Sequence, residues 1–65
     1  MKFKIGYNRQ HKMFNCLLQV DSDKNFWMGG EYFERENIFT VINGAVNNGY
    51  MFSGFTSSAV NALLS

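Results

Sequence analysis

Residues 36–49, ENIFTVINGAVNNG, fit two different structures, and the fold of the whole chain depends on which one forms. The Asn43-Gly44 pair is a strong hairpin-turn signal, and the Phe, Thr, Val and Ile residues around it favour strands. The spacing of the apolar residues favours a helix instead, because at about 100° per residue they fill one continuous arc of roughly 160°. These apolar residues are Ile38, Phe39, Val41, Ile42, Ala45 and Val46, and the opposite side holds Asn37, Thr40, Asn43, Gly44, Asn47 and Asn48. Acidic side chains near the start and Gly49 after the end complete the signature, so we expect a helix.

The first twenty residues predict two antiparallel strands that form a hairpin. Residues 2–7 alternate strictly between apolar and polar side chains, a pattern that is typical of a half-buried strand. Residues 12–20 can form a second strand after a polar turn at residues 8–11, although two of its outward residues are apolar. The side chains expected to face the core are Phe3, Ile5, Tyr7, Phe14, Cys16, Leu18 and Val20, and those expected to face outward are Lys2, Lys4, Met13, Asn15, Leu17 and Gln19.

A third strand is expected from Phe26 towards Phe33. It follows a turn at residues 21–25, where Asp, Ser and Asn side chains can hydrogen-bond to the nearby backbone. Gly29-Gly30 inside the strand predicts a β-bulge or a close approach of another backbone. The first three strands would together form a small antiparallel sheet.

Residues 50–65 predict one more strand and a second helix. Tyr, Met and Phe at residues 50–53 favour a short returning strand, which Gly54 would end. Thr56 or Ser57 can cap the following helix. Its apolar side carries Phe55, Ala59, Val60, Ala62, Leu63 and Leu64, and its polar side carries Ser57, Ser58, Asn61 and Ser65. The order β-β-β-α-β-α predicts an α+β domain with two helices packed on one face of a small antiparallel sheet.

The length of the chain limits both its domain count and its core. At 65 residues and 7.5 kDa, we expect one compact domain over residues 1–65. A chain this short hides only about 60% of its unfolded surface on folding. Its single cysteine, Cys16, and its single histidine, His11, cannot complete a disulfide or a structural zinc site. With 17% aromatic and 46% hydrophobic residues, dense packing or burial against another copy would have to compensate.

Charged side chains are distributed very unevenly, although the net charge is only +1. Residues 1–12 carry four cationic side chains and no acidic one, whereas residues 13–36 carry five acidic and two cationic side chains. Residues 37–65, here called the charge-free segment, carry no charged side chain. Because exposed helix faces of monomers normally carry Lys and Glu, we expect much of this segment to be covered.

The expected location is the cytoplasm. Polar residues interrupt residues 1–12 before the apolar core of a signal peptide can form, and no apolar run approaches the roughly 18 residues of a membrane span. A lone cysteine suits a reducing compartment. The chain is rich in residues whose codons contain mostly A and T, namely Phe, Tyr, Met, Ile, Asn and Lys, and this indicates an AT-rich gene. Such genes occur in phages as well as in many bacteria. A protein encoded by a phage would act in the cytoplasm of its host.

The residues that could bind metal or catalyse a reaction each have a simpler structural explanation. Residues 21–25, DSDKN, match the first ligands of a calcium loop, but Phe26 and Tyr32 occupy positions where that loop needs Gly and Glu. Cys16 is expected to face the core with no paired base, where a thiol is not activated. His11 lies in a turn, where histidines are usually solvated. We therefore expect no enzyme, no metal site and no cofactor.

Nucleic-acid binding is an alternative function that the cationic N-terminal segment supports. The candidate residues are Lys2, Lys4, Arg9, His11 and Lys12. Cationic grooves with stacking aromatic rings hold single-stranded nucleic acids. The expected alternation sends the rings of Phe3 and Tyr7 to the face opposite the lysines, however, which places these rings in the core.

A second candidate surface would contact a partner protein or another copy of the chain. Its residues are Trp27, Phe33, Leu17, Met13, Asn43, Gly44 and Asn47. The four apolar residues, if they lie on the outer face of the sheet, form an exposed patch with Trp27 as its natural anchor. The opposite register of the third strand would place Trp27 in the core instead. The three helix residues have small or amide side chains that would let another backbone come close.

The sequence therefore predicts a small non-enzymatic binding protein that works as a homo-oligomer in the cytoplasm. It would occupy a host protein or sequester a small nucleotide ligand, as a phage-type inhibitor for host takeover or anti-defence would. The alternative is a nucleic-acid-binding regulator that uses the basic N-terminal hairpin. Neither function requires a membrane.

Overall fold

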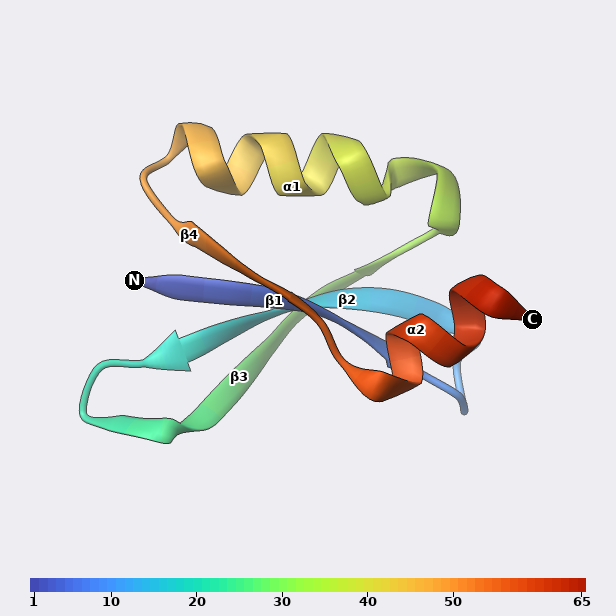
Figure 1. Ribbon diagram of the computed structural model, residues 1–65, viewed down its shortest axis with the longest axis horizontal. Helices are drawn as coiled ribbons and strands as arrows, with labels where there is room; N and C mark the ends of the chain where they lie inside the picture. The colour runs from blue at the N-terminus through green and yellow to red at the C-terminus, as the bar shows by residue number, and fades with distance from the viewer.

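The computed structural model describes residues 1–65 and contains a four-stranded sheet and two helices (Figure 1). The elements are β1 (Lys2–Asn8), β2 (Met13–Val20), β3 (Asp23–Phe33), the short 3-10 helix η1 (Arg35–Asn37), α1 (Ile38–Asn47), β4 (Met51–Phe55) and α2 (Ser57–Leu64). This order confirms the predicted β-β-β-α-β-α sequence and the α+β class. Neither helix is long and apolar enough to cross a membrane.

The strands lie side by side in the order β3-β2-β1-β4. β2 pairs with β1 and with β3 in antiparallel orientation, as expected. β4 pairs with β1 in parallel, so the complete sheet is mixed rather than wholly antiparallel. The reason is α1: a helix after β3 carries the chain back across the sheet, and the next strand then runs in the same direction as β3 and β1.

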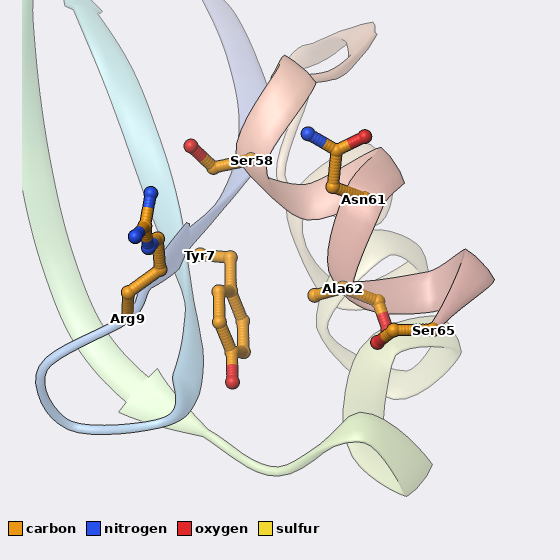
Figure 2. A pocket seen from close by; sticks show the side chains of 6 residues that line it. All are labelled: Tyr7, Arg9, Ser58, Asn61, Ala62 and Ser65. Carbon is orange, nitrogen blue, oxygen red and sulfur yellow. The ribbon is translucent and has the colours of Figure 1, made fainter.

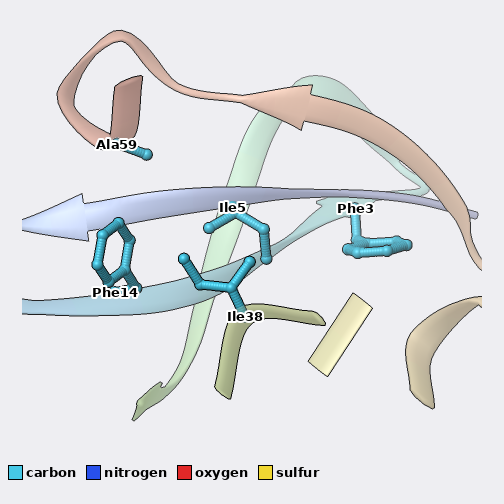
Figure 3. Close-up of a cluster of buried hydrophobic side chains, with 5 residues drawn as sticks. All are labelled: Phe3, Ile5, Phe14, Ile38 and Ala59. Atoms are coloured by element: carbon cyan, nitrogen blue, oxygen red, sulfur yellow. The ribbon is translucent and has the colours of Figure 1, made fainter. Parts of the chain in front are cut away.

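The core lies between one face of the sheet, here called the inner face, and the two helices (Figure 3). Phe3 and Ile5 of β1 are fully buried, as the strict alternation predicted. Phe14, Ile38 and Ala59 complete the buried cluster from β2, α1 and α2. The partly buried side chains around it are Tyr7, Cys16, Leu18, Phe33, Val41, Ile42, Ala45, Tyr50, Ala62 and Leu63. Of the side chains predicted to point inward in β1 and β2, only Val20 belongs neither to the buried cluster nor to the side chains packed around it.

α1 ends with the hydrogen bonds of a Schellman motif. Gly49 has a φ of +92° and donates its N–H to the carbonyl oxygen of Val46 at 3.0 Å. The N–H of Tyr50 reaches back to the carbonyl oxygen of Ala45 at 3.1 Å. Glycine adopts this left-handed conformation without steric cost, so the predicted helix end at Gly49 is confirmed.

The apolar arc of α1 is only partly covered. Four of its six residues contact the core, namely Ile38, Val41, Ile42 and Ala45. Phe39 and Val46 lie on one border of the arc and are 78% and 48% exposed. Phe39 and Val46 therefore remain outside the core, because a helix touches a flat neighbour only along a stripe.

Thr56 caps the N-terminus of α2, since its Oγ1 accepts a hydrogen bond from the N–H of Ala59 at 3.2 Å. The predicted cap is therefore confirmed. Val60 and Leu64, expected on the apolar side of this helix, are instead 41% and 81% exposed. Gly54 does not end β4 as predicted: it adopts a φ of +100° inside the strand, where the register with β1 shifts.

The β2–β3 hairpin is tighter than predicted. Val20 pairs with Asp23, so that only Asp21 and Ser22 form the turn. The remaining residues of the expected turn already belong to β3, where the N–H of Asn25 donates to Oδ1 of Asp23 at 3.0 Å. The turn prediction is thus confirmed for two of its five residues.

A β-bulge interrupts β3 at Gly30. Leu17 pairs with Gly29 and Asn15 pairs with Tyr32, so one residue of β2 faces two residues of β3. A Cβ atom on Gly30 would lie 3.1 Å from a backbone carbonyl oxygen of β2. The predicted bulge and the predicted close backbone approach are both confirmed.

Candidate binding surfaces

Trp27 lies on the outer face of the sheet, opposite the core. It pairs with Gln19, and the Nζ atom of Lys4 lies 4.2 Å from the centroid of its ring. Leu17 pairs with Lys4 and therefore points to the same face. Met13 lies four residues before Leu17 in β2 and points to the same face. It is half-buried, like Leu17 and Trp27. The outer face thus carries three of the four expected apolar interface residues.

Phe33 lies on the inner face, which corrects its expected position on the outer face. It pairs with Phe14, and the two rings stack with centroids 6.4 Å apart and an interplanar angle of 21°. The bulge at Gly30 explains the difference, because one extra residue reverses the face to which the following side chains point. Phe33 therefore packs against the core rather than joining Trp27.

Tyr32 occupies the outer face after the bulge, although it is not among the surface residues predicted from the sequence. Nδ2 of Asn8 donates a hydrogen bond to its hydroxyl at 3.1 Å. The ring of His11 lies against it, with centroids 4.9 Å apart. The glycine pair in β3 was the available signal, because a bulge there predicts the reversed alternation. The outer face therefore presents two aromatic rings, each with a basic side chain beside it.

The basic N-terminal residues divide into two groups. Lys2 and Lys4 alternate with the buried side chains of β1 and point to the outer face, where His11 joins them. Arg9 instead lines a pocket beside α2. Lys12 closes the turn with a φ of 56°, in the left-handed region. The aromatic rings of β1 point into the core, as predicted, and are not interleaved with the cations.

Asn43, Gly44 and Asn47 lie on the exposed side of α1. No atom lies within 4 Å of the position that a Cβ atom on Gly44 would take. The backbone of α1 is therefore accessible from outside at this point, as the sequence predicted for these three residues.

The charge-free segment carries most of the exposed large apolar side chains. Seven of the eleven in the chain lie there: Phe39, Val46, Met51, Phe52, Phe55, Val60 and Leu64. Only five hydrophobic side chains are buried in the entire chain. Exposed apolar side chains with no charged residue among them are therefore the main feature of this segment.

A pocket of about 290 Å³ lies between the end of β1 and α2 (Figure 2). Its lining residues are Tyr7, Arg9, Ser58, Asn61, Ala62 and Ser65. Figure 2 shows the Arg9 guanidinium and the Ser58 hydroxyl on the same side of the opening, above the Tyr7 ring. The sequence predicted that Ser58, Asn61 and Ser65 lie on the polar side of their helix and that Ala62 lies on its apolar side. It could not predict that these residues meet Arg9, because their meeting depends on how α2 packs against β1.

The three groups whose pKa values are shifted, Cys16, Glu34 and Glu36, do not line this pocket. Burial raises the pKa of the Cys16 thiol above its ordinary value of 9.0, which keeps the thiol protonated at neutral pH. Before α1, the hydrogen bond that Glu34 and Glu36 share, followed by their mutual charge, raises the pKa of Glu34. The same hydrogen bond lowers the pKa of Glu36.

No protein-family model, curated protein or solved structure matches this chain. The surfaces described above are therefore the basis for assigning a function. The apolar charge-free segment, the outer face around Trp27 and the pocket at Arg9 are the three that could bind another molecule.

Proposed function

We propose that this protein is a non-enzymatic binding protein that works as a homo-oligomer, with the charge-free segment as the interface between subunits. The observation that carries this proposal is the concentration of seven exposed large apolar side chains in a segment without charge. A two-fold interface brings the same surface of both copies together, so residues near the axis meet their own copies and like charges there would repel. A neutral apolar surface meets its own copy without that repulsion.

A second copy would also supply the burial that the single chain lacks. Domains of this size are marginally stable unless something adds to their core. A standard interface buries about 800 Å² on each partner, which is roughly a sixth of the 4711 Å² of accessible surface on this chain. Association at that scale would leave most of the surface of the chain accessible.

Light scattering at several protein concentrations tests this proposal. The expected result is a stable dimer or larger assembly, which Phe39→Ser combined with Leu64→Ser shifts towards the monomer. Phe26→Ser combined with Met28→Ser is the matched control, because these side chains are 56% and 58% exposed but lie in β3, outside the charge-free segment. A wild-type protein that stays monomeric at every concentration contradicts the proposal, as does an equal effect of the two double variants.

The role of the oligomer would be to occupy a partner protein or to sequester a small nucleotide ligand. The short chain and the AT-rich gene that its composition indicates support a phage-type inhibitor that acts in the host cytoplasm. Co-expression with the host's defence systems tests this role, since a phage plated on such cells should form more plaques when the protein is present. Plaque numbers that do not change in any defended host would contradict it.

Nucleic-acid binding is the second candidate, and the outer face favours it more than the sequence did. Lys4 lies over the ring of Trp27, and His11 lies against the ring of Tyr32. An open sheet face with aromatic rings and cations is suited to single-stranded nucleic acid. Binding of a labelled oligonucleotide should then weaken steeply with salt, and Trp27→Ala should weaken it further. Binding that ignores both salt and this substitution would reject the candidate.

A further inference from the structure

The pocket between β1 and α2 results from the way α2 follows β4. The N–H of Thr56 donates to the carbonyl oxygen of Ile5 at 2.8 Å, which is where β4 stops following the edge of β1. α2 then lies beside the last residues of β1, and Ala59 is fully buried in the core. With Ala59 fixed inward, the polar side of α2 faces Tyr7 and Arg9.

The pocket contains one unpaired positive charge. Arg9 has no hydrogen-bond or ion-pair partner within the chain, whereas Arg35 donates to the carbonyl oxygen of Leu63 at 3.3 Å. No carboxylate side chain belongs to the lining. A free guanidinium presents a planar set of N–H donors that matches two oxygens of a phosphate group. The charge and donor geometry of the pocket therefore favour an anion.

The other lining residues supply further donors and an apolar wall. The hydroxyl of Ser58 and the amide of Asn61 can each donate to a ligand oxygen. The ring of Tyr7 is held edge-on against that of Phe14, with centroids 4.9 Å apart and an interplanar angle of 63°. Tyr7 and Ala62 thus form two apolar surfaces. The volume of 290 Å³ lies near the lower end of small-molecule pockets, which begin at about 300 Å³.

We propose that this pocket binds a small phosphate ester of about mononucleotide size. The phosphate would lie at Arg9 and Ser58, and the organic part would lie against Tyr7 and Ala62. Free phosphate shares the first set of contacts but leaves the apolar walls unused, so the ester should bind more tightly. This inference rests on the proposed function, because it names the ligand of the proposed binding protein. It does not depend on the number of subunits.

Isothermal titration calorimetry at low salt tests the pocket with three probes: adenosine monophosphate, adenosine and inorganic phosphate. Adenosine monophosphate should bind, and the other two should bind at least about tenfold more weakly, because each lacks one set of contacts. Arg9→Gln should weaken binding of the nucleotide by roughly tenfold to a hundredfold, as expected for a lost charged hydrogen bond. Lys24→Gln is the matched control, because it removes the same charge from β3, away from the pocket.

Several outcomes would overturn the proposal. Equal losses for Arg9→Gln and Lys24→Gln would show attraction by net charge alone, and equal affinities for the nucleotide and for phosphate would assign the pocket to the free ion. If no probe binds at millimolar concentration, the pocket is a site for neither the phosphate ester nor free phosphate. Should Arg9→Gln fail to fold by circular dichroism, Ser58→Ala, which leaves the charge unchanged, must weaken nucleotide binding several-fold. Light scattering on the same samples separates the two hypotheses, since an intact oligomer without nucleotide binding refutes only the pocket, and a monomer that binds refutes only the oligomer.

Discussion

The Nζ atom of Lys4 lies 4.2 Å from the centroid of the Trp27 ring, although the two residues belong to strands that do not touch. Lys4 is in β1 and Trp27 is in β3, so the contact spans the outer face of β2, which lies between these strands. The ring face is the negative side of the indole quadrupole, which attracts the ammonium group. This contact joins the basic end of the chain to the acidic middle segment and helps to keep Trp27 on the outer face.

The first prediction concerns this pair. Lys4→Gln should lower the free energy of unfolding by about 0.5–1 kcal/mol, the value of an accessible cation–π contact. Lys2→Gln is the control, because Lys2 is also a cation on the outer face of β1 but does not lie over the indole. Urea denaturation followed by Trp27 fluorescence measures both variants. Equal destabilisation by the two substitutions would show that net charge, not the ring contact, is responsible.

The second prediction concerns the bulge in β3. Gly30→Ala should lower the free energy of unfolding by about 1–3 kcal/mol, the usual cost of overpacking. The new Cβ atom would lie 3.1 Å from the carbonyl oxygen of Cys16, and a paired backbone cannot easily move away. Gly29→Ala is the matched control, because its nearest atom is Nδ2 of Asn15 at 3.2 Å, on a side chain that can rotate. Similar denaturation midpoints for the two variants would contradict this explanation.

The third prediction concerns Gly44 in the middle of α1. Gly44→Ala should raise the free energy of unfolding by about 1 kcal/mol, because alanine is the better helix former and nothing within 4 Å obstructs the added methyl group. The measurement is denaturation followed by circular dichroism, at a concentration where light scattering shows the monomer. A loss of stability there would mean that the surroundings of Gly44 are more crowded than the structure shows.

The sequence was sufficient for elements whose pattern is local. The alternation of residues 2–7 predicted which side chains of β1 are buried, and Phe3 and Ile5 are fully buried. The helical spacing of residues 38–46 outweighed the Asn43-Gly44 turn signal, because a helix collects the apolar side chains on one side and a hairpin would not. Thr56 and Gly49 act as the predicted helix ends, since capping depends only on neighbouring residues.

Features that depend on several elements at once could not be predicted in the same way. The bulge at Gly30 was expected, yet its effect on Phe33 and Tyr32 depends on the number of extra residues, which only the pairing with β2 defines. The parallel pairing of β4 depends on which edge of the sheet α1 reaches. The pocket at Arg9 depends on this pairing, because α2 starts where β4 leaves β1.

The last prediction concerns Cys16 and pH. Burial raises the pKa of its thiol above 9.0 in the folded protein, so the folded state holds the proton more tightly than the unfolded state does. The stabilisation by the protonated thiol is therefore complete below the unfolded pKa and is lost as pH rises from the ordinary thiol value of 9.0 through the higher folded pKa. Wild type and Cys16→Ala, compared by urea denaturation across this range, share every other titrating group. The wild type should lose more stability than the variant as pH rises, and parallel pH profiles would show that the thiol has the same pKa in both states.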